Sequence, residues 1–393
     1  MKSTFMKKLL NGVEVEWTLI GDKRFVEIAN SNRKPVKASL RKLGRTPYFG
    51  ANNIQDYVEG YTHDGVFILI AEDGSASLEK YSIQWATGQF WANNHVHVLR
   101  GTGGLDSRFL YHYLKTVNFI PFLSGGVRAK LTKVKLVEIP IPIPCPENPE
   151  KSLEIQAEIV RILDDFTELT AELTAELTAR KKQYTYYREQ LLTFEVGEIE
   201  WKSLGEVSEI YDSLHKTPQY SEDGMSMIRV TDIKGGFLNL ENALKVNDEV
   251  FDIFTKKYLP KKYDLVMSRV GSYGNIGIVP SDNAVCMGQN TVVMHPMINS
   301  KYLYYILLSN NVQSFIEKNV VGGSQKTLSL KLIKKIPIPI VNEVKQARIV
   351  SILDKFDVLT SSISEGLPRE IELRQKQYEY YRNMLLSFPK EGV

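Results

Sequence analysis

Two glycine-rich segments of the chain carry polar side chains at positions where a loop could approach a ligand closely. They run from Ser124 to Leu131 and from Val321 to Leu328, and each has a Gly-Gly pair followed by polar residues. Glycine permits close backbone approach, and the side chains that follow can bond base edges or phosphates. These side chains are Arg128 and Lys130 in the first segment and Gln325 and Lys326 in the second. Matched positions with unlike side chains predict two related bodies that read different sequences, with plain β-turns as the alternative.

Other chemistry-bearing patterns do not reach the spacing that catalysis requires. The segment from Gly322 to Thr327 lacks the glycine-to-lysine spacing of a phosphate loop, and the glycines from Gly271 to Gly277 are typical of a strand turn rather than a dinucleotide site. His95 and His97 alternate along a predicted strand and should share one face, but no third ligand is near, which favours packing over metal binding. We therefore expect no catalytic residue and no metal site.

Charge and composition indicate a chain without a strong overall attraction to nucleic acid. The 393 residues carry 49 basic and 46 acidic side chains, a net charge of +3. Basic runs lie at 33–42, 128–135, 256–262 and 326–335, and acidic residues gather at 164–176. This pattern fits basic faces on two bodies joined by a neutral or acidic strut, or ordinary solvated faces. The sequence has no apolar run of membrane-spanning length, no secretory leader and only two cysteines, so we expect a cytoplasmic protein.

The chain is an internal duplication. Four motifs occur twice: Glu-Trp with a following Gly, Ile-Pro-Ile-Pro-Ile, Gln-Ala-x-Ile-Val-x-Ile-Leu-Asp-x-Phe, and Lys-Gln-Tyr-x-Tyr-Tyr-Arg-x-x-Leu-Leu-x-Phe. The paired motifs begin at Glu16 and Glu200, Ile139 and Ile336, Gln156 and Gln346, and Lys182 and Lys376. Each copy therefore predicts a mixed domain followed by a long helix.

The helix of the first copy contains a tetrapeptide repeat at 167–182, TELTAELTAELTARKK. It has neither proline nor glycine and should form an exposed helix with one apolar stripe, made by Leu169, Leu173 and Leu177. We interpret it as a spacer, because each tetrapeptide adds about 6 Å of helix. The second copy has four more residues between its landmarks and contains Gly366-Leu-Pro368, where we expect a break.

Each mixed domain shows a similar order of predicted elements. Strands are expected at 67–71 and 96–99 in the first domain and at 264–267 and 290–294 in the second, followed by helices at 107–117 and 301–317. The Ile-Pro-Ile-Pro segments should be stiff extended connectors that cannot donate a full ladder of hydrogen bonds. The predicted class is α+β, with boundaries at 1–144 (domain 1), 145–195 (helix 1), 196–341 (domain 2) and 342–393 (helix 2).

The repeated motifs together resemble those of the specificity (S) subunit of type I restriction-modification enzymes. The resemblance covers the whole chain through the Ile-Pro-Ile-Pro exits, the helix-start and helix-end motifs, the Thr-Ala-Glu-Leu spacer and the Ser-Ile-Ser-Glu-Gly-Leu-Pro stretch at 362–368. It implies two target-recognition domains and two helices packed as an antiparallel coiled coil with pseudo-twofold symmetry. It also implies a bipartite double-stranded DNA target, with one half-site read by each domain in the major groove.

The resemblance points to polar residues near predicted strand ends as DNA contacts. In the second domain these are Arg269, Gln289 and Asn290, since Arg pairs with guanine and Asn or Gln with adenine. The matched positions of the first domain are Glu72 for Arg269 and Asn93-Asn94 for Gln289-Asn290, with Asn52 and Asn53 as further candidates beside Tyr48. Glu72 could accept from a cytosine or be structural. The loop residues Arg128, Lys130, Gln325 and Lys326 complete the predicted DNA-binding set.

The resemblance also implies partners. A non-catalytic subunit of this kind would assemble with two methyltransferase (M) subunits that use S-adenosylmethionine and with restriction (R) subunits that use ATP with Mg²⁺, binding no cofactor itself and no membrane. Helix residues predicted at subunit interfaces are Leu169, Leu173, Leu177, Tyr187, Leu191, Tyr381 and Leu385. Two other possibilities remain: a duplicated coiled-coil scaffold that binds only proteins, and an autonomous nuclease or methyltransferase, which the missing motifs disfavour.

Overall fold

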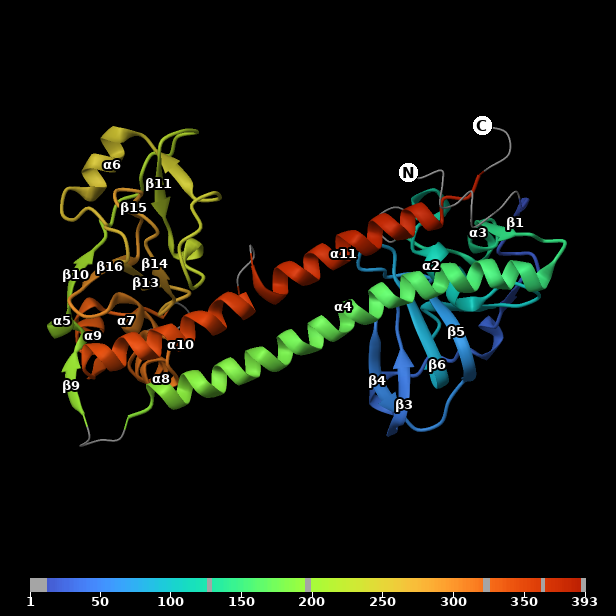
Figure 1. Ribbon diagram of the computed structural model, residues 1–393, viewed down its shortest axis with the longest axis horizontal. Coiled ribbons are helices and arrows are strands. Elements are labelled where there is room, and N and C mark those ends of the chain that lie inside the picture. The colour runs from blue at the N-terminus through green and yellow to red at the C-terminus, as the bar shows by residue number, and fades with distance from the viewer. Residues whose placement is uncertain (1–12, 126–128, 195–198, 321–325, 362–364, 390–393) are drawn as a thin grey trace. The chain divides into compact units, whose positions relative to one another are not determined.

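The apolar run at 67–71 lies in the middle of a six-stranded sheet in the first half of the chain (Figure 1). The computed structural model describes residues 13–125, 129–194, 199–320, 326–361 and 365–389. The chain forms two compact units. Unit 1 comprises Met1–Thr174 with Glu370–Val393, and unit 2 comprises Ala175–Arg369. The long helix α4 (Pro149–Leu192) contributes residues to both units.

The sheet of unit 1 has the order β2-β7-β5-β6-β3-β4, and all its pairs except β3 with β6 are antiparallel. Its strands are β2 (Val26–Ile28), β3 (Leu43–Phe49), β4 (Ile54–Val58), β5 (His63–Ala71), β6 (Ile83–Ala92) and β7 (Val96–Gly101). Alternate residues of β5 enter two different cores: Ile68 and Ile70 pack with Leu99, whereas Phe67 and Leu69 pack on the opposite side. A strand buried on both faces needs apolar residues throughout, which explains the continuous run.

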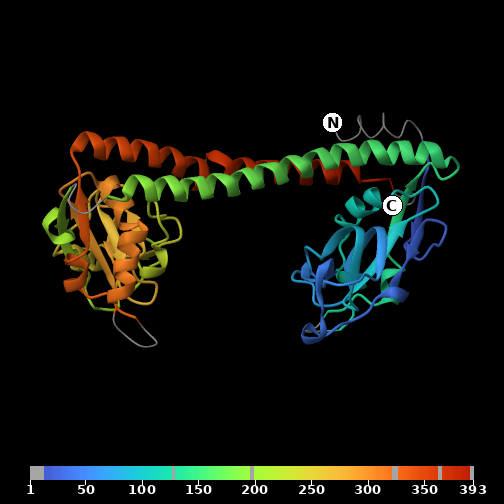
Figure 2. The same cartoon turned by 90° about the horizontal axis from the view of Figure 1, so that it is seen from below.

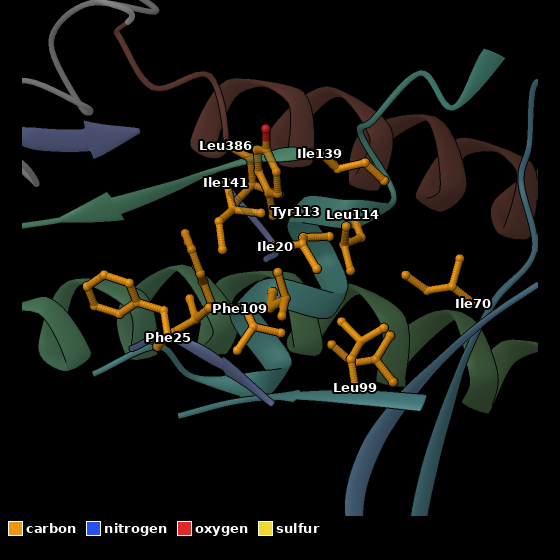
Figure 3. Close-up of a cluster of buried hydrophobic side chains, with 14 of the residues drawn as sticks. Ile20, Phe25, Ile70, Leu99, Phe109, Tyr113, Leu114, Ile139, Ile141 and Leu386 are labelled. Atoms are coloured by element: carbon orange, nitrogen blue, oxygen red, sulfur yellow. The ribbon is translucent and has the colours of Figure 1, made fainter. Parts of the chain in front are cut away.

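The larger core of unit 1 is built from segments far apart in the sequence (Figure 3). Phe109 and Leu114 come from α2 (Ser107–Leu114), Ile141 comes from β8 (Pro140–Pro144), and Leu386 follows α11 (Gly366–Leu385). The short elements η1 (Asn30–Asn32), η2 (Ala38–Leu40), η3 (Ile120–Phe122) and α3 (Lys133–Leu136) connect the strands. The C-terminal helix is therefore part of the first domain's core.

The Ile-Pro-Ile-Pro segments are paired strands, which corrects the expectation of connectors with an incomplete ladder. β8 pairs antiparallel with β1 (Val15–Leu19), and β17 (Pro337–Ile340) pairs antiparallel with β9 (Glu200–Ser203). The bonds from Ile20 N–H to the Ile139 carbonyl and from Cys145 N–H to the Glu14 carbonyl show that the odd-numbered residues face β1. The prolines occupy the alternate positions, where the ladder needs no N–H, so they do not interrupt it.

Unit 2 repeats this plan with smaller sheets. One has the order β10-β16-β13-β14 and the other β12-β11-β15. Their strands are β10 (Ser208–Asp212), β11 (Met225–Ile228), β12 (Leu244–Val246), β13 (Leu265–Ser268), β14 (Ile276–Ile278), β15 (Val285–Met287) and β16 (Thr291–Pro296). Here too Leu265 and Met267 face one core and Val266 the other. The predicted central strands of both domains are confirmed.

The helix predicted at 301–317 is two helices, α7 (Ser300–Leu307) and α8 (Asn310–Asn319). The prediction was wrong there because Ser309 caps α8, its hydroxyl accepting from the Val312 N–H. The remaining helices of unit 2 are α5 (Leu204–Val207), η4 (Val230–Asp232), α6 (Asp248–Thr255), α9 (Leu330–Lys334) and α10 (Glu343–Ser361). Within unit 2, α10 runs antiparallel to the last turns of α4, and within unit 1, α11 runs antiparallel to its first turns (Figures 1 and 2).

The break expected near Gly366 is present, since α10 ends at Ser361 and α11 begins at Gly366. Gly366 has a φ of +77°, a left-handed conformation that favours glycine. A Cβ at this position would lie 2.3 Å from the carbonyl oxygen of Val358 and 2.9 Å from that of Leu359. The first residue of α11 therefore packs directly against the last turns of α10, and glycine is required there.

Substituting Gly366 with alanine should destabilise this junction by about 1–3 kcal/mol, because both the backbone conformation and the space oppose a side chain. The measurement is the free energy of unfolding of the full chain in urea. Gly236→Ala is a matched control, since Gly236 also has a positive φ, of 63°, but its Cβ would meet nothing within 4 Å. Equal losses in the two variants would show that the close approach contributes nothing.

Candidate nucleic-acid interface

The residue after the central strand makes the same pair of backbone hydrogen bonds in both domains, and one bond of each pair reaches the last residue of the glycine-rich segment. Glu72, which follows β5, donates its N–H to the His95 carbonyl at 2.8 Å and accepts from the Leu131 N–H at 2.7 Å. Arg269, which follows β13, donates to the Asn290 carbonyl at 2.8 Å and accepts from the Leu328 N–H at 2.8 Å. The predicted match of Glu72 with Arg269 therefore agrees with the backbone.

The second predicted match is shifted by one residue. The carbonyls of His95 and Asn290 accept the equivalent backbone hydrogen bond in the two domains. Gln289 therefore corresponds to Asn94 and not to Asn93. Asn290 has a φ of +64°, a left-handed conformation that asparagine tolerates better than most residues. Its role in the turn is therefore partly conformational.

Glu72 lies inside a cluster of its own chain. Its carboxylate pairs with the Arg33 guanidinium at 2.6 Å and the Lys130 ammonium at 2.9 Å, and the side chain is 15% exposed. Burial by itself would raise the pKa of Glu72, but the hydrogen bonds from Arg33 and Lys130 outweigh it and hold the pKa below its usual value. A cytosine that approached this carboxylate would compete with two cations of the same chain.

The Arg269 side chain is likewise bonded within its own chain. Its guanidinium pairs with the Asp212 carboxylate at 2.5 Å, its Nε–H donates to the Leu328 carbonyl at 3.1 Å, and the side chain is 12% exposed. The Arg269 guanidinium, which was expected to bond guanine, thus bonds other groups of the protein. Both strand-end residues predicted as base contacts hold parts of the fold together in this structure.

Three further predicted positions also make internal contacts. Asn93 is only 3% exposed and its side-chain oxygen accepts from the His95 N–H, so its prediction as a base contact is corrected to a turn-forming residue. Asn52 donates to the Gly74 carbonyl and accepts from the Ala76 N–H, which ties two loops together. Tyr48, named beside it, is buried.

The residues that remain available to a ligand are fewer than predicted. Asn53, Asn94 and Lys326 are exposed, Gln289 is half-buried, and Lys130 keeps part of its surface beside Glu72. The Lys326 ammonium lies 5.9 Å from the centre of the Tyr273 ring. Arg128 and Gln325 lie outside the described residues.

Sequence reasoning missed an acid–base pair in the same loops. The Asp73 carboxylate lies 2.5 Å from Nδ1 of His95, and both side chains are partly exposed. The expectation that His95 and His97 share a face is wrong, because His95 precedes β7 whereas His97 is buried within it and bonds the Leu131 carbonyl at 2.7 Å. The charge of Asp73, next to Glu72, was the only signal for this pair.

The helix residues predicted at subunit interfaces divide into two groups. Leu385 is 1% exposed in the core of unit 1, and Leu191 packs against the core of unit 2. Tyr381 stacks on Phe166 with ring centres 5.2 Å apart, and Tyr187 stacks on Phe356 at 5.8 Å. These four side chains contact their own chain, and for Leu385 the interface prediction is corrected to core packing. Leu169, Leu173 and Leu177 are half-buried, as an apolar stripe requires.

Each domain is joined to its long helix by equivalent polar contacts. Gln156 accepts from the N–H of the residue that caps α2, and Gln346 accepts from the N–H of the residue that caps α7. About two helical turns further on, Asp164 accepts from Arg108 and contacts His112, whereas Asp354 accepts from Lys301 and Tyr305. The duplication is thus visible in the structure. The accepting residues on the long helices are of the same type in both copies, whereas the donors on α2 and α7 differ.

Comparison with known proteins agrees with this geometry. The family model of the type I restriction modification DNA specificity domain matches residues 14–180 and 197–373. The chain belongs to this family. The two matched segments begin near β1 and β9, the first strands of the two copies. The chain therefore provides DNA sequence specificity in a restriction-modification system.

Relatives cover nearly the whole chain. A Haemophilus influenzae protein named as the type I restriction enzyme specificity subunit S.HindORF215P is 47% identical over 401 residues, 98% of each chain. The EcoR124I/EcoR124II specificity subunit of Escherichia coli is 35% identical over 407 residues, again 98% of each. The crystal structure of a type I S subunit from M. genitalium shares the fold, with a TM-score of 0.59 at 18% identity, over 97% of this chain and 98% of that one.

The described residues contain neither a metal-binding cluster nor a membrane-spanning helix. No group of three or more His, Cys, Asp or Glu side chains in these ranges could hold a metal ion. None of the helices in the described part of the chain has the length and apolar character needed to cross a membrane.

The burial of His112 predicts a sensitivity to acid. Burial lowers the pKa of His112 to about 4, against an ordinary value of 6.5, although Asp164 opposes the shift. Between these values the unfolded chain binds the extra proton, so stability should fall as the pH drops from 6.5 toward 4. His112→Tyr, which copies Tyr305 of the other unit, should make urea unfolding less dependent on pH across this range.

The reciprocal variant is Tyr305→His, which should introduce acid sensitivity into unit 2 at the same place. Unfolding midpoints measured at pH 7 and pH 5 for both variants test the assignment. An unchanged pH dependence in both would show that these positions do not control it.

Proposed function

We propose that this chain is a non-catalytic recognition subunit that reads a bipartite double-stranded DNA target, one half-site with each mixed domain. The observation that carries the proposal is the repeated pair of backbone hydrogen bonds, which joins the last residue of each glycine-rich segment to an equivalent strand end, while the side chains of the two segments differ. A constant frame with variable side chains is what two readers of unlike sequences require. Asn53, Asn94, Gln289 and Lys326 are the described candidates for direct contact.

The long helices would serve as the spacer between the two half-sites. Antiparallel pairing of α4 with α11 in unit 1, and of α4 with α10 in unit 2, supports a coiled coil along the length of these helices. Such a helix pair would hold two domains at a set separation, as dimeric DNA-binding proteins hold two half-sites on one face of the duplex.

The proposed partners are two methyltransferase subunits and a set of restriction subunits. An internal duplication offers two equivalent surfaces, which suits two copies of one partner. In such a complex S-adenosylmethionine would belong to the methyltransferase subunits and ATP with Mg²⁺ to the restriction subunits. We assign no cofactor to this chain, and we place the complex in the cytoplasm, where its DNA lies.

Duplex binding by the chain assembled with its methyltransferase subunits tests the proposal directly. Affinity for a cognate duplex should exceed that for random duplex by at least about 10³-fold, and both affinities should fall steeply as salt rises. The cognate sequence comes from methylation mapping of cells that contain the complex. Binding that ignores sequence and salt would support a protein-binding scaffold instead.

Deleting Thr174 to Leu177 removes one tetrapeptide and should shorten α4 by about 6 Å, which changes the number of unspecified base pairs between the half-sites. The half-site sequences themselves should remain. Methylation mapping of the variant gives both results. A length-preserving control, Glu172→Gln with Glu176→Gln, should leave the spacing unchanged, and an unchanged spacing in the deletion would reject the spacer role of α4.

A further inference from the structure

We propose that Glu72 and Arg269 are equivalent positioning residues that latch the described ends of the glycine-rich segments, at Lys130–Leu131 and Thr327–Leu328, and that they set the specificity of the two half-sites without contacting a base. The inference rests on the proposed function and assigns a role to two residues within it. It also reverses the expectation, from residue type alone, that Arg269 reads guanine.

The two residues occupy one place in the duplicated frame. Each follows the central strand of its sheet and forms the same backbone bonds, to Leu131 in unit 1 and Leu328 in unit 2. Isolated bridges reinforce the match, because Asp73 pairs with Lys130 and Val270 pairs with Thr327. The residue after each latch is thus joined to the next-to-last residue of the glycine-rich segment.

The side chains make the same connection with opposite charge. In unit 1, Glu72 holds Lys130 of the glycine-rich segment and Arg33, which follows η1. In unit 2, Arg269 holds the Leu328 carbonyl at the end of that segment and Asp212, the last residue of β10. Each latch therefore joins a central strand end, the glycine-rich segment and a chain segment at the sheet edge.

The partners differ together with the latch. Where unit 1 has an acid at position 72, the paired loop residue is Lys130. Where unit 2 has Arg269, the loop residue is Thr327, which carries no charge, and the counter-charge comes from Asp212. The Arg33–Glu72 and Asp212–Arg269 pairs are mostly buried, whereas the Lys130 side chain is 44% exposed. Loss of Asp212 would leave the buried charge of Arg269 without its ion-pair partner. A side chain that contacts bases directly would need none of these ion-pair partners.

A charge-reversal cycle in unit 2 separates a latch from a reader. The variants are Arg269→Glu, Asp212→Arg and the double change, each assembled with the methyltransferase subunits. Each single change should lower methylation of the cognate duplex at least about tenfold and relax several positions of one half-site. The double change should recover much of the loss, because the pair is restored with its charges exchanged. If Arg269 reads a base, the double change recovers nothing and a single position is relaxed.

Unit 1 supplies an independent test and a matched control. Glu72→Gln should relax the other half-site and leave the half-site controlled by Arg269 unchanged. Arg100→Gln breaks a 2.7 Å pair with Glu27 between β2 and β7, away from the loops, and should change neither half-site. Equal effects of Glu72→Gln and Arg100→Gln would overturn the proposal, since any lost ion pair would then have the same effect.

A conservative variant separates loss of the latch from loss of folding and from failure of the proposed function. Arg269→Lys keeps the charge with fewer donors and should be intermediate, with an unfolding midpoint close to the unaltered chain; a complete loss of specificity in a folded Arg269→Lys complex would again indicate a base contact. If the unaltered complex methylates no bipartite sequence, the proposed function fails. If it does methylate one and the double change recovers nothing, only the latch fails.

Discussion

One carboxylate in each unit holds the domain to its long helix, and the placement of the loops depends on it. The Asp164 carboxylate is hydrogen-bonded to Arg108 and His112 of α2, and the Asp354 carboxylate to Lys301 and Tyr305 of α7. The glutamines eight residues earlier bond the caps of the same domain helices. Because α2 and α7 pack under the central strands, a fixed helix orientation also fixes the strand ends that present the glycine-rich segments.

The two copies keep the same backbone arrangement, while several of the side chains that hold it differ between them. The acceptors Gln156, Asp164 and their counterparts are the same residue types in both copies, whereas the donors differ, histidine in one and tyrosine in the other. The strand-end residue changes further, from acid to base, with its partners changed as well. A backbone held by bonds that do not depend on side-chain type leaves the side chains of the loops free to diverge.

Much of the fold could be predicted from the sequence, because the features concerned are local or repeated. The apolar runs at 67–71 and 264–267, the interruption near Gly366 and the duplication itself are visible as patterns. The roles of Glu72 and Arg269 could not be predicted, since an ion pair with a residue 39 or 57 positions away leaves no periodic pattern in the sequence. Residue type predicted what these side chains can bond, and the tertiary structure decided which partner they have.

The alternation of isoleucine and proline in β8 and β17 also bears on aggregation. An exposed strand edge offers unpaired N–H groups to other chains, but the outer edges of these two strands consist of prolines and have none. One outward carbonyl in each strand is also bonded within the chain, since Tyr113 donates to Pro140 and Tyr302 to Pro339. A chain whose two copies contain the same strand sequence could otherwise pair with other molecules of itself, and the proline edge offers such pairing no N–H donor.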